Sequence, residues 1–294
     1  MNSAEAGAKA AAIAGRVRQL TPRDLKQGAL LPARAGYRRA WMRRGQDITR
    51  AMTHASALVI APHPDDETLG CAVSIMRKRE AGTPVTVVIV SDGAASDPAP
   101  LPPAELIVLR KEEARRAVTR LGLRPTDVRF LDVPDTKVGE HIDEVADRLV
   151  ELINELAPEQ LLIPISCEGH PDHDATNVAA REAARRAGFT GQILEYGVWF
   201  WTHWPWTKGY GAKDQADRRT LRDPLDRIRE VRPLIVAAKG YRSRQAHALA
   251  AHSSQVGAQA GGSDLPRSLL AATRTPFEVY VEAGALDHLN FPTQ

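Results

Sequence analysis

The sequence predicts an α/β fold in which a mostly parallel sheet is covered by helices on both faces. Short apolar runs alternate with segments of helical spacing along residues 55–188, which is typical of parallel strands joined by right-handed crossovers. The apolar runs are continuous, as expected of strands that are buried on both faces. The chain has 294 residues, 43% of them hydrophobic and 26% charged, which suits a globular protein with a sizeable core.

Four apolar or β-branched runs predict the first strands of the sheet, at 55–62, 83–93, 127–135 and 160–166. Helical spacing predicts the helices that follow them, at 66–82, 103–122, 142–158 and 174–188. Pro103 opens the second helix and Gly122 lies just past its end, where each residue type is favoured. The sequence after residue 190 is less regular, and there we expect two strands and one helix, at 192–201, 276–283 and 242–255 respectively.

The first 54 residues predict a basic, mainly helical extension, and residues 55–294 predict one α/β domain. The extension is rich in alanine and arginine and lacks strand-type runs. Such a segment could contact an anionic membrane surface, a phosphate-bearing substrate or another subunit, and a homo-oligomer is compatible with it. Lys9 and Arg16 interrupt the first apolar stretch, and no apolar run approaches the ~20 residues that span a bilayer. We therefore expect no transmembrane segment and a soluble cytoplasmic protein.

Net charge and cysteine content limit the classes of function. The formal net charge is +3, which is too weakly basic to predict a nucleic-acid partner. The two cysteines, Cys71 and Cys167, cannot build a disulfide scaffold. Each lies beside a histidine cluster and is a candidate metal ligand, but a reduced, buried and inert thiol is the favoured interpretation.

Two clusters of histidine and acidic residues follow two of the predicted strands. The stretch APHPDDETLGC (61–71) comes after the first strand, and EGHPDHD (168–174) comes after the fourth. The ligand-type side chains of the two clusters are His63, Asp65, Asp66, His170, Asp172 and His173. In open parallel sheets, ligands bind beyond the carboxyl ends of the strands, so we predict the functional site at that edge.

Acidic residues also follow the other two strands, since Asp92 comes after the second and Asp135 after the third. A simpler interpretation exists for each histidine cluster alone, because acidic residues favour helix N-termini and loop histidines can be solvated. That interpretation does not account for two such clusters at equivalent strand ends. We therefore favour a functional site.

The residue types in the two clusters suit a catalytic metal. Imidazole and carboxylate together are typical zinc ligands, and a catalytic zinc site has three protein ligands and a water. Two histidines and one aspartate from the two loops would supply these ligands, and Fe²⁺ would be accepted in place of Zn²⁺. A further aspartate could act as general base, and a further histidine could donate a hydrogen bond or proton to the substrate.

The motifs PHPDDE and HPDH, in this order and in this α/β context, resemble those of the PIG-L (LmbE-like) de-N-acetylases. The resemblance covers about residues 55–255 and includes RKEEARRAVTRLG (110–122) and HALAAHSSQ (247–255). It implies a Rossmann-like three-layer sandwich with the catalytic site at the carboxyl ends of the strands. It also implies a zinc-dependent hydrolase that removes an acetyl group from an N-acetylglucosamine-type amino sugar or its conjugate.

The resemblance assigns a role to each matching residue. The metal ligands would be His63, Asp66 and His173. Asp65 would be the general base for the attacking water. His170 would stabilise the oxyanion and protonate the leaving amine, and Asp172 would orient His170.

Substrate contacts are expected from Arg110, Asp92 and Asp135. For Arg110, an ion pair with Glu113 is an equal alternative. Trp204 lies in an aromatic stretch and could stack on a sugar ring, with core packing as the alternative. His252 and Gln255 are expected to serve loop structure.

One position departs from the family pattern. In mycothiol-pathway members a tyrosine lies two residues before the histidine that matches His170, and here that position is Glu168, which cannot donate a hydrogen bond when ionised. Two other functions are compatible with the sequence: an amidase acting on a thiol-sugar conjugate or a lipid-linked sugar, and a non-catalytic metal-binding module. The second has no reason to keep Asp65 beside its ligands.

Overall fold

The structure is a computed structural model, and it describes residues 32, 35–95, 101–166, 168–203, 229–256, 265, 269–270 and 273–286. The contacts divide the chain into two units, Met1–Gly36 and Tyr37–Gln294, and the fold reported below is that of the second unit. No helix in these described ranges has the length and apolar character needed to cross a membrane.

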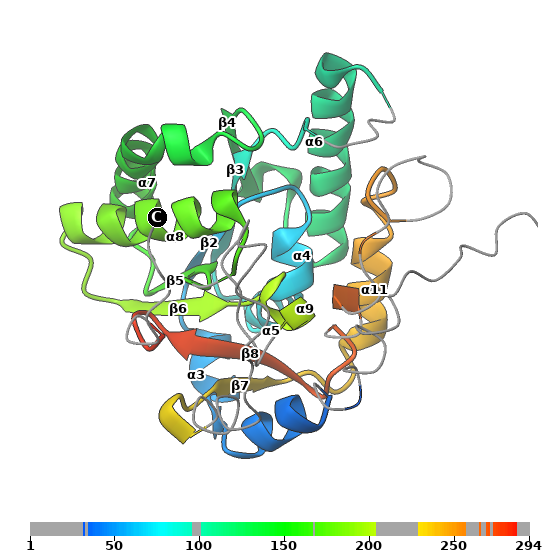
Figure 1. The fold of residues 1–294 in the computed structure, drawn as a ribbon, viewed down its shortest axis with the longest axis vertical. Helices are drawn as coiled ribbons and strands as arrows, with labels where there is room; N and C mark the ends of the chain where they lie inside the picture. Colours follow the sequence, from blue (N-terminus) through cyan, green and yellow to red (C-terminus); the bar gives the residue numbers. More distant parts are fainter. Residues whose placement is uncertain are drawn as a thin grey trace, which may run out of the picture. The chain divides into compact units, whose positions relative to one another are not determined.

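Within the described residues, eight strands form one sheet in the order β1-β7-β8-β6-β5-β2-β3-β4 (Figure 1). The strands are β1 (Gln46–Asp47), β2 (Ala57–Ala61), β3 (Val85–Ser91), β4 (Val128–Val133), β5 (Gln160–Pro164), β6 (Gln192–Tyr196), β7 (Leu234–Ala237) and β8 (Phe277–Glu282). Strand β8 runs antiparallel to β6 and β7, and every other pair is parallel. The mostly parallel sheet that the sequence predicts is therefore confirmed.

Helices cover both faces of this sheet, as Figure 1 shows. The helices are α3 (Thr49–His54), α4 (Asp66–Gly70), α5 (Ala72–Glu80), α6 (Pro103–Arg120), α7 (Ile142–Leu156), α8 (Pro171–Arg186), α9 (Phe200–His203) and α11 (Arg242–Leu249), with short 3-10 helices η1 (Pro125–Asp127) and η2 (Val138–Glu140). Successive side chains of β2 point to opposite faces: Leu58 and Ile60 pack in the core with α7 and α8, whereas Val59 and Ala61 pack with α5, α6 and α11. This arrangement confirms the three-layer α/β sandwich.

The sheet order places the two histidine-bearing loops next to each other. From β2 the chain moves through β3 to β4 on one side, and β5 then returns to pair with the other edge of β2 before β6 continues outward. The order of the strands thus reverses between β2 and β5. A crevice opens beyond the carboxyl ends of strands at such a switch point, because the two crossovers leave on opposite faces.

Several element boundaries differ from those expected from the sequence. The helix expected at 66–82 is divided into α4 and α5 at Cys71, where the backbone leaves helical geometry (φ −124°, ψ 3°). Gly70 just before this break lies so close to the Tyr196 ring that an added Cβ would come within 2.2 Å of it. Helix α8 begins at Pro171, three residues earlier than expected, with His170 as its N-cap. Strands β1 and β7 were not expected from the sequence.

Part of the expected N-terminal extension lies in the second unit. Strand β1 pairs with β7, and α3 packs its Met52 into the core. Trp41 and Met42 are buried with Phe200 and Ile235, and the Trp41 indole donates a hydrogen bond to the Val231 carbonyl. These two apolar side chains are therefore not available for the membrane contact considered for the N-terminal extension. The domain boundary at residue 54 stays a prediction.

Candidate active site

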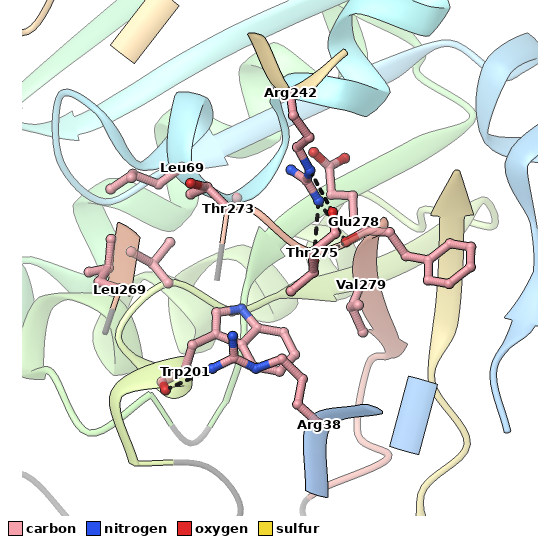
Figure 2. Close-up of a pocket in the computed structure, with 13 residues that line it drawn as sticks. Arg38, Leu69, Trp201, Arg242, Leu269, Thr273, Thr275, Glu278 and Val279 are labelled. Atoms are coloured by element: carbon pink, nitrogen blue, oxygen red, sulfur yellow. Dashed lines mark hydrogen bonds between the residues drawn. The ribbon is translucent and has the colours of Figure 1, made fainter. Parts of the chain in front are cut away.

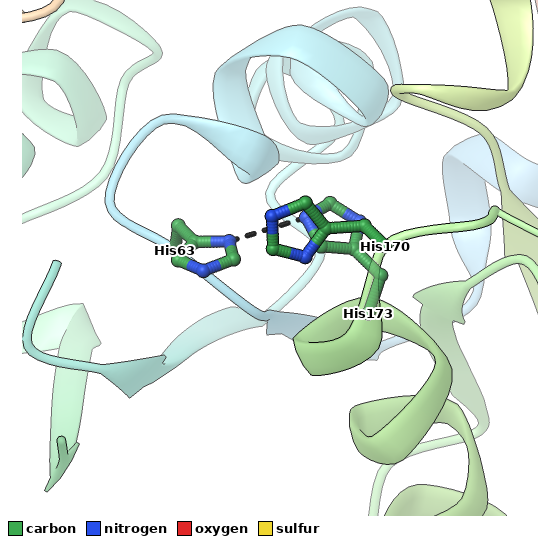
Figure 3. Close-up of side chains that lie close together, drawn as sticks. All are labelled: His63, His170 and His173. Atoms are coloured by element: carbon green, nitrogen blue, oxygen red, sulfur yellow. Dashed lines mark hydrogen bonds between the residues drawn. The ribbon is translucent and has the colours of Figure 1, made fainter. Parts of the chain in front are cut away.

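Two loops meet at the carboxyl ends of the adjacent strands β2 and β5. His63 comes from the loop after β2, and Asp66 is the first residue of α4. His170 is the N-cap of α8, and His173 lies in its first turn. Figure 3 shows the three imidazole rings gathered together. Their ring centroids lie 4.8, 5.0 and 5.1 Å apart.

Three side-chain atoms of this cluster form a nearly equilateral triangle. His63 Nδ1 lies 3.1 Å from His173 Nε2, and Asp66 Oδ2 lies 3.4 Å from the first nitrogen and 3.2 Å from the second. A tetrahedral ion with metal–ligand bonds of about 2.0–2.1 Å needs donor atoms about 3.3 Å apart. The atoms of the three residues expected as ligands therefore fit the edges of a tetrahedral site. Two overlapping groups, His63–His170–His173 and His63–Asp135–Asp172, also have donor atoms within 4.8 Å of one another.

The second ring nitrogen of His63 faces two carboxylates. His63 Nε2 lies 3.2 Å from both Asp135 Oδ1 and Asp172 Oδ2. Asp172 is itself held by the backbone N–H groups of Thr136, at 2.7 Å, and Val138, at 3.3 Å. A metal-ligating histidine often donates its other N–H to a carboxylate, which fixes the tautomer of the ring. These two aspartates thus hold His63 with Nδ1 turned toward Asp66 and His173.

The charges around the triangle favour a cation. Burial lowers the pKa of His63, but Asp135, Asp172 and Asp66 outweigh it and raise that pKa well above its usual value. Burial also lowers the pKa of His173, but the nearby carboxylates raise it to about 9. The same pairing with His173 lowers the pKa of Asp66 far below its usual range, against the effect of burial. A metal ion in place of the protons on His63 and His173 would be stabilised by the same carboxylates.

Asp65 differs from the neighbouring Asp66 in both backbone and environment. It has a positive φ of 139° with ψ −19°, a conformation that strains any residue other than glycine. Its side chain is buried, and the described part of the chain supplies no hydrogen bond to its carboxylate. Burial raises the pKa of Asp65 to about 7, and the charge of Asp66 acts in the same direction. The loop thus presents the Asp66 carboxylate to the triangle, and it holds the Asp65 carboxylate buried and more easily protonated.

His170 stands beside the triangle with its ring against an aromatic wall. Its ring stacks on that of Trp199, with centroids 6.1 Å apart and an interplanar angle of 19°. Burial, followed by the charges of His173 and His63, lowers the pKa of His170 to about 3. The neutral imidazole is therefore favoured, and it carries one N–H that can donate a hydrogen bond. The contact expected between His170 and Asp172 stays a prediction, since the bonds described for Asp172 lead to His63 and the backbone.

The residues expected to contact substrate lie in different surroundings. Arg110 of α6 is buried and donates a hydrogen bond to the Gly93 carbonyl, near the acidic groups of the site. Asp92 accepts the backbone N–H of Ala94 at 2.9 Å and that of Asp135 at 3.1 Å, so it braces the loop after β4. Trp204 lies outside the described residues.

His252 and Gln255 contact the loop after β2 and the helix α4 that follows it, as expected of residues that serve loop structure. His252 Nε2 lies 3.3 Å from Glu67 Oε1, and both side chains are fully buried. Gln255 donates to the Pro64 carbonyl. Cys71 is buried and belongs to neither overlapping metal-type group, while Cys167 lies outside the described residues.

Two contributors to the site were not assigned a role from the sequence. Glu168 lies behind His173, with Oε2 3.4 Å from His173 Nδ1. Trp199 forms the wall behind His170. Glu168 was noticed only as a departure from a family pattern, and Trp199 only as part of an aromatic stretch.

The described residues also form a pocket whose lining residues are not those of this cluster. Figure 2 shows that its lining includes Leu69 and Trp201, together with Arg38, Arg242 and Glu278. Arg242 donates to the carbonyls of Thr275 and Phe277, and Arg38 donates to that of Trp201. The guanidinium groups are thus engaged with the backbone, and none of the expected site residues lines this pocket.

Comparison with known protein families finds one that matches the part of the chain that carries this site. The model of the PIG-L family, described as GlcNAc-PI de-N-acetylase, matches residues 58–184. Residues 58–184 are a PIG-L family region. It contains both histidine-bearing loops, so the family resemblance of the two motifs is confirmed.

Curated relatives of this PIG-L region are deacetylases by name. The diacetylchitobiose deacetylase of Thermococcus kodakarensis is 31% identical over 135 residues, which cover 45% of this chain and 49% of that protein. The probable N-acetyl-alpha-D-glucosaminyl L-malate deacetylase 2 of Bacillus subtilis is 34% identical over 135 residues, covering 44% of this chain and 60% of that protein. The chain therefore spans about half to three-fifths of the length of these relatives.

Solved structures share the fold of the PIG-L region and its surroundings. The N,N'-diacetylchitobiose deacetylase of Pyrococcus horikoshii, in complex with an inhibitor, is similar with a TM-score of 0.58 and 19% identity, over 82% of this chain and 88% of that one. The zinc-inhibited form of teicoplanin deacetylase Orf2 has a TM-score of 0.55 and 19% identity, over 77% of this chain and 97% of that one. At this identity the likeness shows the α/β fold.

Proposed function

We propose that this protein is a metal-dependent hydrolase that removes an acetyl or acyl group from the amide nitrogen of an N-acetylglucosamine-type amino sugar or its conjugate. The observation that carries the proposal is the triangle of His63, Asp66 and His173, with Asp65 and His170 beside it. The family match and the deacetylase relatives support the reaction and the class of substrate.

Zn²⁺ is the metal we propose for the triangle, and Fe²⁺ is the alternative. The donor set of two imidazoles and one carboxylate suits either ion, and the edge lengths fit tetrahedral coordination. When bound, such an ion lowers the pKa of water toward ~7 and polarises a carbonyl.

The remaining residues of the cluster handle protons and orient the substrate. Asp65 is buried, and no described residue donates a hydrogen bond to its carboxylate, so it is suited to take a proton from the attacking water. His170 is the candidate for stabilising the oxyanion and protonating the leaving amine. Its lowered pKa favours the first of these roles, because a neutral imidazole donates an N–H without having to be charged first.

The residues expected to contact substrate differ in the roles that we propose for them. Arg110 remains a candidate, because its buried guanidinium lies among acidic groups of the site and can bond a sugar hydroxyl. The contacts of Asp135 with His63 favour a role in holding that histidine. Asp92 accepts two backbone N–H groups, which favours a role in loop structure. Trp204 keeps its proposed role as a wall of the sugar site.

Two alternatives differ from this proposal in substrate or in chemistry. An amidase acting on a thiol-sugar conjugate or a lipid-linked sugar would use the same cluster. A non-catalytic metal-binding module would need only the triangle. The strained and buried Asp65 argues against such a module, because strain of this kind is retained where it serves a mechanism.

The proposal is tested by acetate release from a panel of N-acetylglucosaminyl compounds that includes free sugar, disaccharide, thiol-conjugate and lipid-linked forms. We expect release from at least one sugar, loss of activity after chelation, and recovery with Zn²⁺ or Fe²⁺. Metal-loaded Asp65→Asn protein is the control for contaminating activity. Tight metal binding with no turnover on any compound would favour the metal-binding module.

The proposal also covers the cellular location and the oligomeric state of the protein. We propose a cytoplasmic protein with a small-molecule substrate, and sedimentation of the full chain tests for a homo-oligomer. Flotation with anionic vesicles tests for peripheral membrane contact through residues 1–54.

A further inference from the structure

Glu168 is a fully buried carboxylate (0% exposed) that joins two parts of the site. Its Oε1 accepts the backbone N–H groups of Val198, at 2.6 Å, and Phe200, at 2.7 Å. Its Oε2 faces His173 Nδ1 at 3.4 Å. In the described residues these two facing atoms have no other hydrogen-bond partner, so each is the only group that can satisfy the other.

This pairing sets which nitrogen of His173 carries a proton. An ionised carboxylate can only accept hydrogen bonds, so the nitrogen that faces it must be the N–H of the ring. In the neutral ring, which is the form that can bind a metal, Nε2 is then the nitrogen with the lone pair, and it lies 3.2 Å from Asp66 Oδ2 and 3.1 Å from His63 Nδ1. A ligating histidine whose other nitrogen donates to a carboxylate is fixed in orientation and is a more basic ligand.

The same carboxylate fixes the wall behind His170. Val198 and Phe200, whose N–H groups bond Glu168, flank Trp199 in the chain, and the Trp199 ring stacks on His170. One side chain therefore sets both the ring of His173 and the position of the segment that supports His170.

We propose that Glu168 is a positioning residue of the metal centre, which holds His173 in the tautomer that leaves Nε2 free for a metal and anchors the segment 198–200 behind His170. The inference rests on the proposed metal site and adds to it a requirement for a carboxylate at this position. It also accounts for the departure from the tyrosine of mycothiol-pathway members: Glu168 is turned toward His173 and the backbone, where only an acceptor is useful.

The decisive variant is Glu168→Gln, which changes one oxygen to an NH₂ group with almost no change in shape. The amide oxygen can still accept the two backbone N–H groups, so the NH₂ group faces His173 Nδ1 and donates to it. His173 then favours a proton on Nε2, where the metal would bind. We expect the affinity for Zn²⁺, measured by chelator competition, to fall about 10- to 100-fold.

The matched control is Glu278→Gln. Glu278 is also a buried carboxylate that accepts two backbone N–H groups, one on each oxygen, from Val73 and Ser74. It also accepts the Ser74 and Tyr280 hydroxyls, and among the described residues it has no bond to the histidine cluster. We expect this control to bind Zn²⁺ with unchanged affinity. Equal losses in both variants would mean that the effect reflects general disruption of the core, and would overturn the proposed role of Glu168.

A second readout is independent of affinity and of whether a variant folds. NMR of Zn²⁺-loaded wild-type protein with labelled histidines should show a hydrogen-bonded Nδ1–H proton on His173 that exchanges slowly with water. Its absence, or wild-type Zn²⁺ affinity in Glu168→Gln, would overturn the inference while leaving the metal site intact. Failure of the wild-type protein to bind Zn²⁺ or Fe²⁺ would instead refute the metal site itself.

Discussion

The loops after β2 and β5 supply similar side chains, but their backbones differ in strain. In the loop after β5, the one described residue with positive φ is Gly169, at 73°, and Pro171 begins α8 two residues later. In the loop after β2, the positive φ of 139° falls on Asp65, which has a side chain. Glycine adopts such conformations at little cost, whereas a residue with a Cβ is strained by them.

This difference separates two kinds of group at the site. The groups proposed to bind metal from helices, Asp66 and His173, occupy the first turns of α4 and α8, where regular hydrogen bonding holds the backbone. The proposed base, Asp65, sits outside the helix on a strained residue. The positions of these two proposed ligands therefore follow from ordinary secondary structure, and the position of the proposed base is obtained at a cost in stability.

The largest effect is expected from removing a ligand from either loop. His63→Ala, Asp66→Ala and His173→Ala should each lose the metal or bind it much more weakly, and activity should fall to background. Each removes one corner of the triangle, and a catalytic zinc site has only three protein ligands. Elemental analysis checks the metal content, and Cys71→Ser is the control that should keep it. Full occupancy in the histidine variants would refute the ligand set.

A smaller effect is expected from Asp65→Asn, which leaves the triangle complete. The variant should keep its metal but turn over about 10²–10⁴ times more slowly, because an amide cannot take the proton from water. A base must be unprotonated to act, so the wild-type rate should fall on the acidic side of the pH–rate profile. Since burial raises the pKa of Asp65, that limb should lie above the usual range of an aspartate, and it should flatten or move in the variant. Turnover near that of the wild type would remove Asp65 from the mechanism.

His170→Ala tests the other loop in the same way. The metal should again be retained, and the rate should fall about 10²–10³-fold, because an oxyanion would lose one hydrogen-bond donor. The basic limb of the pH–rate profile should change if His170 also supplies the proton to the leaving amine, and it should keep its position if His170 acts only as a neutral donor. Steady-state kinetics over pH and metal analysis of the same preparation check both parts. Loss of metal in this variant would make His170 a ligand.

The fold was largely predictable because its central strands are buried on both faces. Strands β2, β3 and β5 carry nearly unbroken apolar runs, and that pattern is visible without any knowledge of partners. Strand β1 is two polar, exposed residues whose only strand property is backbone pairing with β7, so its side chains carry no signal. The four residues of β7 are too short a run to stand out in an irregular region.

The site was predictable only where its parts are close in sequence. The two motifs identify residues that meet because β2 and β5 are neighbours, and the alternation of elements suggests that both loops lie at one edge. The partners of these residues depend on packing between distant segments. Glu168 reaches Val198 across 30 positions, and Asp172 reaches His63 across 109. Such pairings leave no local pattern, so the roles of Glu168 and Trp199 needed the structure.

The smallest expected effect measures the strain that distinguishes the two loops. Asp65→Gly and Asp65→Ala both remove the buried carboxylate, but only glycine relieves the backbone. At an ordinary position alanine is the more stabilising residue by about 0.4–1 kcal/mol. At position 65 we expect the reverse, with the glycine variant more stable by about 1–3 kcal/mol. Both variants should be inactive, so the gain is visible only in stability.

The companion substitution is Gly169→Ala in the other loop, which places a Cβ on a residue with φ 73°. It should lower the free energy of unfolding by about 1–2 kcal/mol, the usual cost of a left-handed conformation for an L-residue. Urea unfolding of the chelator-treated proteins measures all three variants against wild type, with an unchanged m-value as the condition for comparing them. If alanine proves more stable than glycine at position 65, the loop after β2 is not strained. Asp65 would then owe its position to packing alone, and the contrast between the two loops would be lost.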